Sequence, residues 1–213
     1  MDSYIEIKAL SKSFDNKPVI VDLNWRIDQG KCCMVAGPNG SGKSTLLKMI
    51  CGLLQPKEGR VDFILAGKKI KPHVLFRYVG LTSPDLNLYG KLTVFENLVL
   101  FARLRDVQNW KKKITELLDF FELEKFAFQQ FSCLSTGIKQ RLKLASALVH
   151  EPLFLVLDEP GAGLDHTGKL MIYKVLDQQL KKGLAVMATN DEEEVKKYGS
   201  ETIRLNPFSQ PGG

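Results

Sequence analysis

The segment Gly37 to Thr45, GPNGSGKST, constrains the fold of this chain more than any other stretch. It follows an apolar run, Cys32 to Ala36, that predicts a buried strand, and it leads into Leu46 to Ile50, which predicts a helix. Strand, glycine-rich loop and helix in this order make a P-loop, in which backbone N–H groups and the helix N-terminus bind phosphate. A glycine-rich loop without a ligand is the alternative. The order of the elements favours the P-loop and an α/β fold around it.

The residues of this loop have separate expected tasks. Glycines allow the backbone to wrap around the α- and β-phosphates of a nucleotide, and Lys43 has the length and charge to reach the β- and γ-phosphates. Ser44 supplies a hydroxyl oxygen for Mg²⁺. We therefore expect the nucleotide to be held by Asn39, Gly40, Ser41, Gly42, Lys43, Ser44 and Thr45.

A second motif, LFLVLDEP, runs from Leu153 to Pro160. Its continuous apolar part is typical of a strand buried on both faces of a parallel sheet. Such a strand delivers Asp158 and Glu159 to the carboxyl edge of the sheet, beside the P-loop. We expect Asp158 to hold Mg²⁺, directly or through water, and Glu159 to orient and deprotonate an attacking water. Acidic residues also end many strands for structural reasons, and the P-loop in the same chain is what favours a catalytic interpretation.

A third motif, LSTGIKQR, runs from Leu134 to Arg141 at the start of a predicted helix. Ser135 is a suitable N-cap, and Gly137 keeps the backbone open, so this helix end is able to receive an anion through N–H groups and the helix dipole. An ordinary capped helix is the alternative interpretation.

LSTGIKQR resembles the LSGGQ-type signature of ABC ATPases, and other motifs of that family recur around it. GPNGSGKS is similar to its Walker A motif, LFLVLDEP to its Walker B motif with the catalytic glutamate at Glu159, and Gly161 to Asp165 to its D-loop. Phe14 stands where the family has an aromatic residue that stacks on adenine, whereas a strand-end core residue is the alternative. The resemblance implies an ATPase whose cofactors are ATP and Mg²⁺.

The fold that the resemblance implies is a P-loop NTPase (RecA-like) core with an N-terminal antiparallel β-subdomain and an inserted helical subdomain. We expect one domain over 1–213, with the core and β-subdomain in 1–83 and 151–205, the helical subdomain in 84–150 and a tail at 206–213. The apolar patterns predict strands at Tyr4–Leu10, Val19–Ile27, Arg60–Leu65, Val74–Thr82, Leu184–Ala188 and Glu201–Leu205, and helices at Val94–Leu104, Trp110–Phe121, Ser135–His150, Thr167–Lys182 and Asp191–Tyr198.

The resemblance also implies partners. Two nucleotide-binding subunits, expected to be copies of one chain, pair head to tail, so that ATP lies between the P-loop of one and the Ser135 and Gly137 segment of the other. Their movement is passed to an integral membrane permease, which would place this chain at the cytoplasmic face of the cell membrane. The short chain and its form of the signature resemble exporter subunits, such as the ATP-binding subunit of the haem exporter of cytochrome c maturation.

A soluble ABC ATPase that acts on nucleic acid or ribosomes is the alternative function. The formal net charge is +6, but the basic residues are scattered, and the interval from Lys43 to Ser135 leaves no room for a long coiled coil. We therefore expect no nucleic acid partner. A metabolite or nucleotide kinase would share the P-loop but would leave the signature and D-loop unexplained.

Two positions depart from the family pattern. The family usually carries a histidine where this chain has Asn190, and an asparagine amide donates a hydrogen bond but carries neither a proton nor a positive charge. The family also has a glutamine near the end of the predicted strand Val74–Thr82, where this chain has Ser83 or Pro84. We expect normal binding of Mg·ATP and slow hydrolysis, with Glu159, Lys43 and Asn190 as the catalytic residues.

Overall fold

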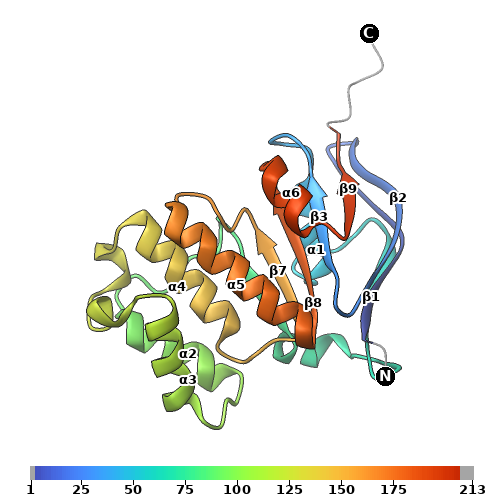
Figure 1. The fold of residues 1–213 in the computed structure, drawn as a ribbon. Coiled ribbons are helices and arrows are strands. Elements are labelled where there is room, and N and C mark those ends of the chain that lie inside the picture. The colour runs from blue at the N-terminus through green and yellow to red at the C-terminus, as the bar shows by residue number, and fades with distance from the viewer. Residues whose placement is uncertain (1–2, 207–213) are drawn as a thin grey trace.

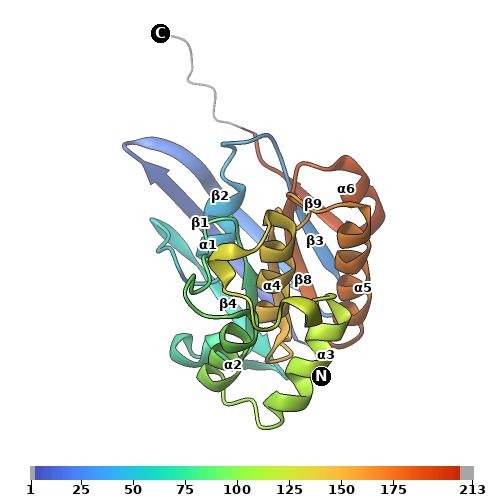
Figure 2. The same cartoon turned by 90° about the vertical axis from the view of Figure 1, so that its left-hand side faces the viewer.

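Two β-sheets lie face to face in the computed structural model, which describes residues 3–206 (Figures 1 and 2). The antiparallel sheet has the strand order β2-β1-β4-β5, formed by β1 (Tyr4–Phe14), β2 (Lys17–Asp28), β4 (Glu58–Leu65) and β5 (Lys68–Lys69). The parallel sheet has the order β6-β7-β8-β3-β9, formed by β6 (Val79–Thr82), β7 (Phe154–Asp158), β8 (Leu184–Thr189), β3 (Cys32–Ala36) and β9 (Glu201–Arg204). The predicted tail beyond residue 206 lies outside the described residues.

The hairpin of β1 and β2 forms because its turn residues tolerate a left-handed backbone. Asp15 and Asn16 have φ angles of 48° and 60°, and Phe14 pairs with Lys17 directly across the turn. Asp and Asn adopt such angles more easily than other residues with a side chain. The turn places the end of the hairpin beside the P-loop.

The parallel sheet is buried on both faces, as its uninterrupted apolar sequence predicts. One face packs against α1 (Lys43–Ile50) and the antiparallel sheet, through a cluster that includes Val35, Leu46 and Phe63. The other face packs against α4 (Thr136–Leu148) and α5 (His166–Lys182), through a cluster that includes Leu155, Leu142 and Ile172. Helices and a second sheet therefore enclose the strand that feeds the P-loop.

The predicted helices are confirmed to within a few residues. α2 (Val94–Leu104) begins at a capping box in which Thr93 and Glu96 each bond to the other's backbone N–H. α3 (Trp110–Phe120) follows, and with α4 these helices gather at one side of the molecule (Figure 1). α6 (Glu192–Tyr198) begins after Asp191, whose side chain accepts from the backbone N–H of Glu193.

The predicted strand Val74–Thr82 is wrong in its first half. Pro72–Arg77 forms a 3₁₀ helix, η1, and only Val79–Thr82 forms β6. Val79 pairs with Phe154, the first residue of β7, and the carbonyl oxygen of Tyr78 accepts from the N–H groups of Leu153 and Phe154, so residues 72–77 have no neighbouring strand to bond with. Two further 3₁₀ turns, η2 (Glu124–Phe126) and η3 (Phe131–Cys133), connect α3 to α4.

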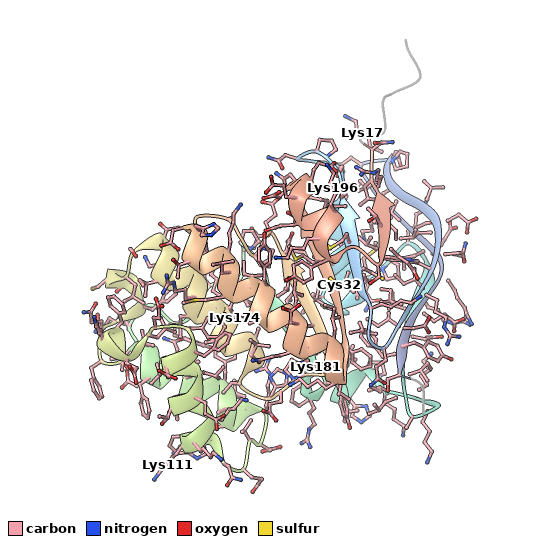
Figure 3. All side chains as sticks on the ribbon, in the orientation of Figure 1. Lys17, Cys32, Lys111, Lys174, Lys181 and Lys196 are labelled. Atoms are coloured by element: carbon pink, nitrogen blue, oxygen red, sulfur yellow. The ribbon has the colours of Figure 1, made fainter. Side chains whose placement is uncertain are left out.

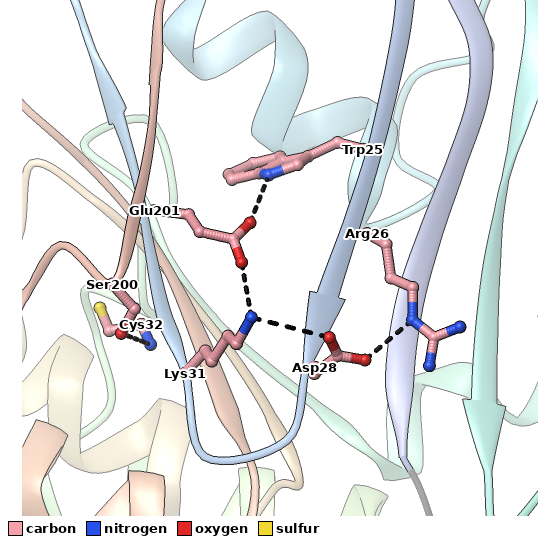
Figure 4. A network of polar contacts seen from close by, with 7 residues as sticks. All are labelled: Trp25, Arg26, Asp28, Lys31, Cys32, Ser200 and Glu201. Carbon is pink, nitrogen blue, oxygen red and sulfur yellow. Dashed lines mark hydrogen bonds and ion pairs between the residues drawn. The ribbon is translucent and has the colours of Figure 1, made fainter.

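A polar network joins the antiparallel sheet to the edge of the parallel sheet (Figure 4). Glu201 of β9 accepts a hydrogen bond of 3.1 Å from the indole N–H of Trp25 on β2 and one of 2.6 Å from Lys31. Lys31 precedes β3 and also lies 3.8 Å from Asp28. The network fixes β2 against β9, next to the strand that leads to the P-loop.

The cationic side chains are spread over the surface. Figure 3 shows Lys17, Lys111, Lys174, Lys181 and Lys196 at separate points of the molecule, on the hairpin, α3, α5 and α6. In the part of the chain that the structure describes, every helix is too short or too polar to cross a membrane.

Candidate nucleotide-binding and catalytic site

The loop between β3 and α1 has a backbone that only glycine permits at its critical points. Gly42 has a φ of 99°, and a Cβ at this position would lie 2.5 Å from a methyl group of Val19 on β2. Gly40 has a φ of 80°, and the space where its Cβ would point contains no atom within 4 Å. The loop is therefore packed tightly on its hairpin side and open on its outer side, where the exposed Asn39 and Gly40 lie.

Lys43, the first residue of α1, places its ammonium group inside this loop. The residue is 5% exposed, and its Nζ donates to the carbonyl oxygens of Gly37 at 2.8 Å and Pro38 at 3.2 Å. The nearest carboxylate, Glu159, lies 3.6 Å away. The positive charge thus stands at the P-loop with neutral carbonyls as its closest partners, an arrangement suited to an exchange for phosphate oxygens.

Asp158 ends β7 on the same edge of the sheet. It is 2% exposed, and its Oδ1 has no hydrogen-bond partner among the described residues. Burial raises the pKa of Asp158, while a hydrogen bond from Ser44 lowers it in part. A buried, unpartnered carboxylate oxygen beside a serine hydroxyl is a donor set that fits Mg²⁺, because this ion prefers oxygen ligands and retains bound water.

Glu159 has a left-handed backbone that is unusual for a residue with a side chain. Its φ is 46°, and its N–H donates to the carbonyl oxygen of Ala188 on β8 at 2.9 Å. The side chain is 32% exposed and remains within ion-pair distance of Lys43. Backbone strain of this kind concentrates at functional sites, and here it follows directly after the buried strand.

Asn190 follows β8 and reaches the P-loop. Its side-chain amide donates to the Oδ1 of Asn39 at 3.1 Å. Glu159 and Asn190 both line a cavity of about 350 Å³, together with Gly161, Ala162, Lys169, Thr189, Asp191 and Glu194. The fold thus brings the ends of β3, β7 and β8 to one site, and with them Lys43, Glu159 and Asn190.

Two charged residues at this cavity have no counterpart in the sequence interpretation. Glu194 is 2% exposed and accepts a hydrogen bond from the hydroxyl of Thr189, while burial raises the pKa of Glu194. Lys169 of α5 pairs with Asp191 at 3.0 Å. The sequence of α6 has three consecutive acidic residues and does not indicate which of them points inward. The packing of α6 on β3 and β8 is what buries Glu194.

Phe14 lies at the surface and not in the core. The ring is 46% exposed at the end of β1, with the ammonium of Lys12 at 5.3 Å from its centroid. Its hairpin carries Val19, which packs against Gly42 of the P-loop. The strand-end core interpretation is therefore wrong, and the ring stands open to a ligand on the hairpin side of the loop.

Ser135 and Gly137 form a separate group. Ser135 caps α4, with its Oγ accepting from the N–H of Ile138 at 3.4 Å, and it is exposed. Gly137 lies near Gly163 of the predicted D-loop, whose carbonyl oxygen would be 3.5 Å from an added Cβ. No hydrogen bond or ion pair among residues 3–206 joins this group to the P-loop of the same chain.

Comparison with known proteins gives a consistent result. A family model described as ABC transporter matches residues 20–162. The Nod factor export ATP-binding protein I of Rhizobium leguminosarum bv. viciae is 35% identical over 187 residues, which cover 87% of this chain and 60% of that protein. An uncharacterized ABC transporter ATP-binding protein of Bacillus subtilis (strain 168) is 36% identical, with 86% and 61% covered. The chain thus spans about three fifths of the length of these relatives.

Solved structures agree in fold. The dimeric structure of a bacterial ABC transporter cassette superposes with a TM-score of 0.84 at 27% identity, covering 95% of this chain and 94% of that one. A dimeric post-hydrolysis state of an ATP-binding cassette, bound to ADP and Pi, gives a TM-score of 0.83 at 26% identity, with 96% and 97% covered. The fold that carries the P-loop, the acidic strand end and the capped α4 is therefore the fold of these cassettes. The chain belongs to the ABC transporter family, whose ATP-binding cassettes are ATPases.

Proposed function

We propose that this chain is the ATP-binding and ATP-hydrolysing subunit of a membrane transporter, and that it works as a head-to-tail pair. The observation that carries the proposal is the convergence at one sheet edge of Lys43, whose ammonium group is hydrogen-bonded only to backbone carbonyls of the P-loop, and Asp158, whose buried Oδ1 lacks a partner among the described residues. A site with these two features is prepared for a phosphate group and a cation together.

The residues at this edge take separate tasks in the proposal. The backbone of Asn39 to Gly42, with Ser41 and Thr45, surrounds the phosphates, and Lys43 bonds the β- and γ-phosphates. Ser44 and Asp158 hold Mg²⁺, which when bound draws charge from the phosphate oxygens. The exposed ring of Phe14 stacks on the adenine.

Glu159 acts as the base for the attacking water. Its carboxylate lines the same cavity as Asn190 and lies 3.6 Å from Lys43 of the P-loop, so it stands beside the proposed phosphate site. Asn190, fixed by Asn39, donates a neutral hydrogen bond to the same phosphate. Hydrolysis by the isolated chain is slow in this proposal, because a neutral donor stabilises developing negative charge less than a cationic one.

Ser135 and Gly137 complete the site of a second copy. Their group faces solvent and is not bonded to its own P-loop, while the capped end of α4 offers N–H groups and a positive dipole to phosphate. The dimeric arrangement of the similar cassettes supports the same pairing. We propose further that 84–150, which contains α2 to α4, moves as the helical subdomain relative to the core.

The test uses Glu159→Gln. Loss of the base should lower kcat by about 10²- to 10⁴-fold and leave ATP binding intact, so ATP should convert the variant from monomer to dimer in light scattering. Ser135→Arg, combined with Glu159→Gln, is the control: it should bind nucleotide but stay monomeric. An ATP-loaded Glu159→Gln chain that remains monomeric would contradict the proposed pairing.

An apolar groove on the surface is the observation that supports the proposal of a membrane partner. It lies between the end of α1, η1 and α2, has a volume of about 320 Å³, and exposes Leu53 (65%) and Phe76 (46%). Exposed large apolar side chains around a hollow are typical of protein docking sites. We propose that a permease segment occupies this groove at the cytoplasmic face of the membrane, and that transport is outward, as the name of the similar Nod factor export protein states for that protein.

A further inference from the structure

Ser83 lies next to Asp158 at the carboxyl edge of the parallel sheet. β6 and β7 run parallel, and their last pair is Thr82 opposite Leu157; Ser83 and Asp158 are the residues that directly follow this pair. Neighbouring strands of a sheet are about 4.8 Å apart. Ser83, one of the two residues that stand near the glutamine position of the family, therefore follows β6 beside the proposed metal site.

The alternation of side chains along β6, continued by one residue, indicates which way the Ser83 side chain faces. Gly80 faces α4, because a Cβ there would collide with the carbonyl oxygen of Ala147. Thr82 shares that face, since side chains two residues apart point the same way. Val79 packs in the cluster of α1 on the opposite face, and the same alternation puts Ser83 on the α1 side.

Asp158 faces the same way. Phe154 and Val156, which precede it on β7 at alternate positions, belong to the cluster that packs with α1. Ser83 and Asp158 are thus adjacent and face the same helix.

Both side chains carry a buried oxygen without a partner. Ser83 is 7% exposed, and in the described part of the chain neither its Oγ nor the Oδ1 of Asp158 has a hydrogen-bond partner. A buried polar atom that lacks a partner is costly and therefore rare. A water molecule bound to a cation has two strong donors, and two neighbouring acceptor oxygens match them.

The backbone around Ser83 is held in place from two sides. The nearly buried Lys143 of α4 donates to the carbonyl oxygens of Pro84 at 3.0 Å and Ser83 at 3.4 Å. Lys48 of α1 pairs with Asp85 at 2.7 Å. Two lysines therefore fix the segment after β6 relative to both helices.

We propose that the Ser83 hydroxyl accepts a hydrogen bond from a water molecule on the nucleotide-bound Mg²⁺ and shares that water with Asp158. The inference rests on the proposed function, since it needs the metal at Ser44 and Asp158. Ser83 then contacts the metal through water although the family's glutamine is absent, and Asn190 becomes the main cause of slow hydrolysis.

The experiment measures Mn²⁺ binding to the ADP complex of the whole chain by electron paramagnetic resonance. Ser83→Ala should weaken Mn²⁺ by about tenfold, as is usual when a residue that supports a metal ligand is removed. Thr82→Val is the matched control: it also removes a buried hydroxyl without a partner, but from the α4 face, and should leave Mn²⁺ binding unchanged. Ser83→Gly serves in the same assay if Ser83→Ala does not fold.

ADP binding in EDTA distinguishes a failure of the proposed function from a failure of the proposed role of Ser83. It should be equal in the wild type and both variants, because no metal takes part. A wild-type chain that binds no ADP would contradict the proposed function. If ADP binds but Ser83→Ala holds Mn²⁺ as tightly as the wild type, or Thr82→Val weakens it equally, the role of Ser83 is refuted.

Discussion

At the scale of single residues, we propose that Asn190 sets how strongly the site stabilises the charge on the γ-phosphate. Its amide donates a hydrogen bond to Asn39, so the side chain lies against the P-loop. A neutral amide forms a weaker bond to phosphate than an imidazolium does, since charge-assisted hydrogen bonds are about twice as strong. At Glu159, by contrast, the chain keeps the glutamate of the family motif, and the backbone there has a left-handed conformation.

The residue-scale prediction is that Asn190→His raises kcat. A gain of about 1.4 kcal/mol in transition-state stabilisation corresponds to about tenfold in rate. Steady-state ATPase assays of the two proteins check this, with Asn190→Ala expected to fall below the wild type. If the wild type already exceeds about 1 s⁻¹, the lower end of ordinary enzymes, and histidine adds nothing, then Asn190 does not limit the reaction.

At the scale of elements, β6 depends on close contact with α4. A Cβ on Gly80 would overlap the carbonyl oxygen of Ala147 and lie 2.7 Å from the ring of Pro152. Gly80→Ala should therefore destabilise the fold by about 1–3 kcal/mol, the usual cost of overpacking. Gly90→Ala is the control, because its nearest neighbour, the Cβ of Ser132, would be 3.8 Å away. Urea unfolding midpoints at constant slope measure both, and equal midpoints would mean that α4 moves freely away from β6.

At the scale of the whole molecule, the apolar groove and the nucleotide site lie at opposite ends of α1. Lys43 begins this helix at the P-loop, and Cys51, directly after its last turn, lines the groove. A rigid helix of eight residues therefore joins the two proposed binding surfaces. We propose that this helix couples binding at the two surfaces.

The corresponding prediction concerns the membrane partner. Phe76→Asp should reduce recovery of a multi-span membrane protein from solubilised membranes by about tenfold or more, because a charge in an apolar docking site is costly to bury. Phe128→Asp is the control, since Phe128 is 87% exposed and does not line the groove. Recovery of ribosomes in place of a membrane protein would refute the transport proposal.

Local sequence was sufficient for most elements. The bounds of α2 match the prediction, because a capping box and an apolar period lie within one short segment. The first half of the predicted strand Val74–Thr82 is wrong for a non-local reason. Its residues have strand-like composition, but β7 begins only opposite Val79. The length of a strand depends on its partner, and that partner stands far away in the sequence.

The sequence by itself determined the P-loop, the family resemblance and the order of the elements, since each follows from residues close together in the chain. Only the tertiary structure paired β6 with β7, so that Ser83 and Asp158 directly follow the last pair, turned Glu194 inward and left Phe14 at the surface. These outcomes depend on which strand pairs with which and on which face each helix covers. Such choices are made by packing between distant segments, and no local pattern of residues encodes them.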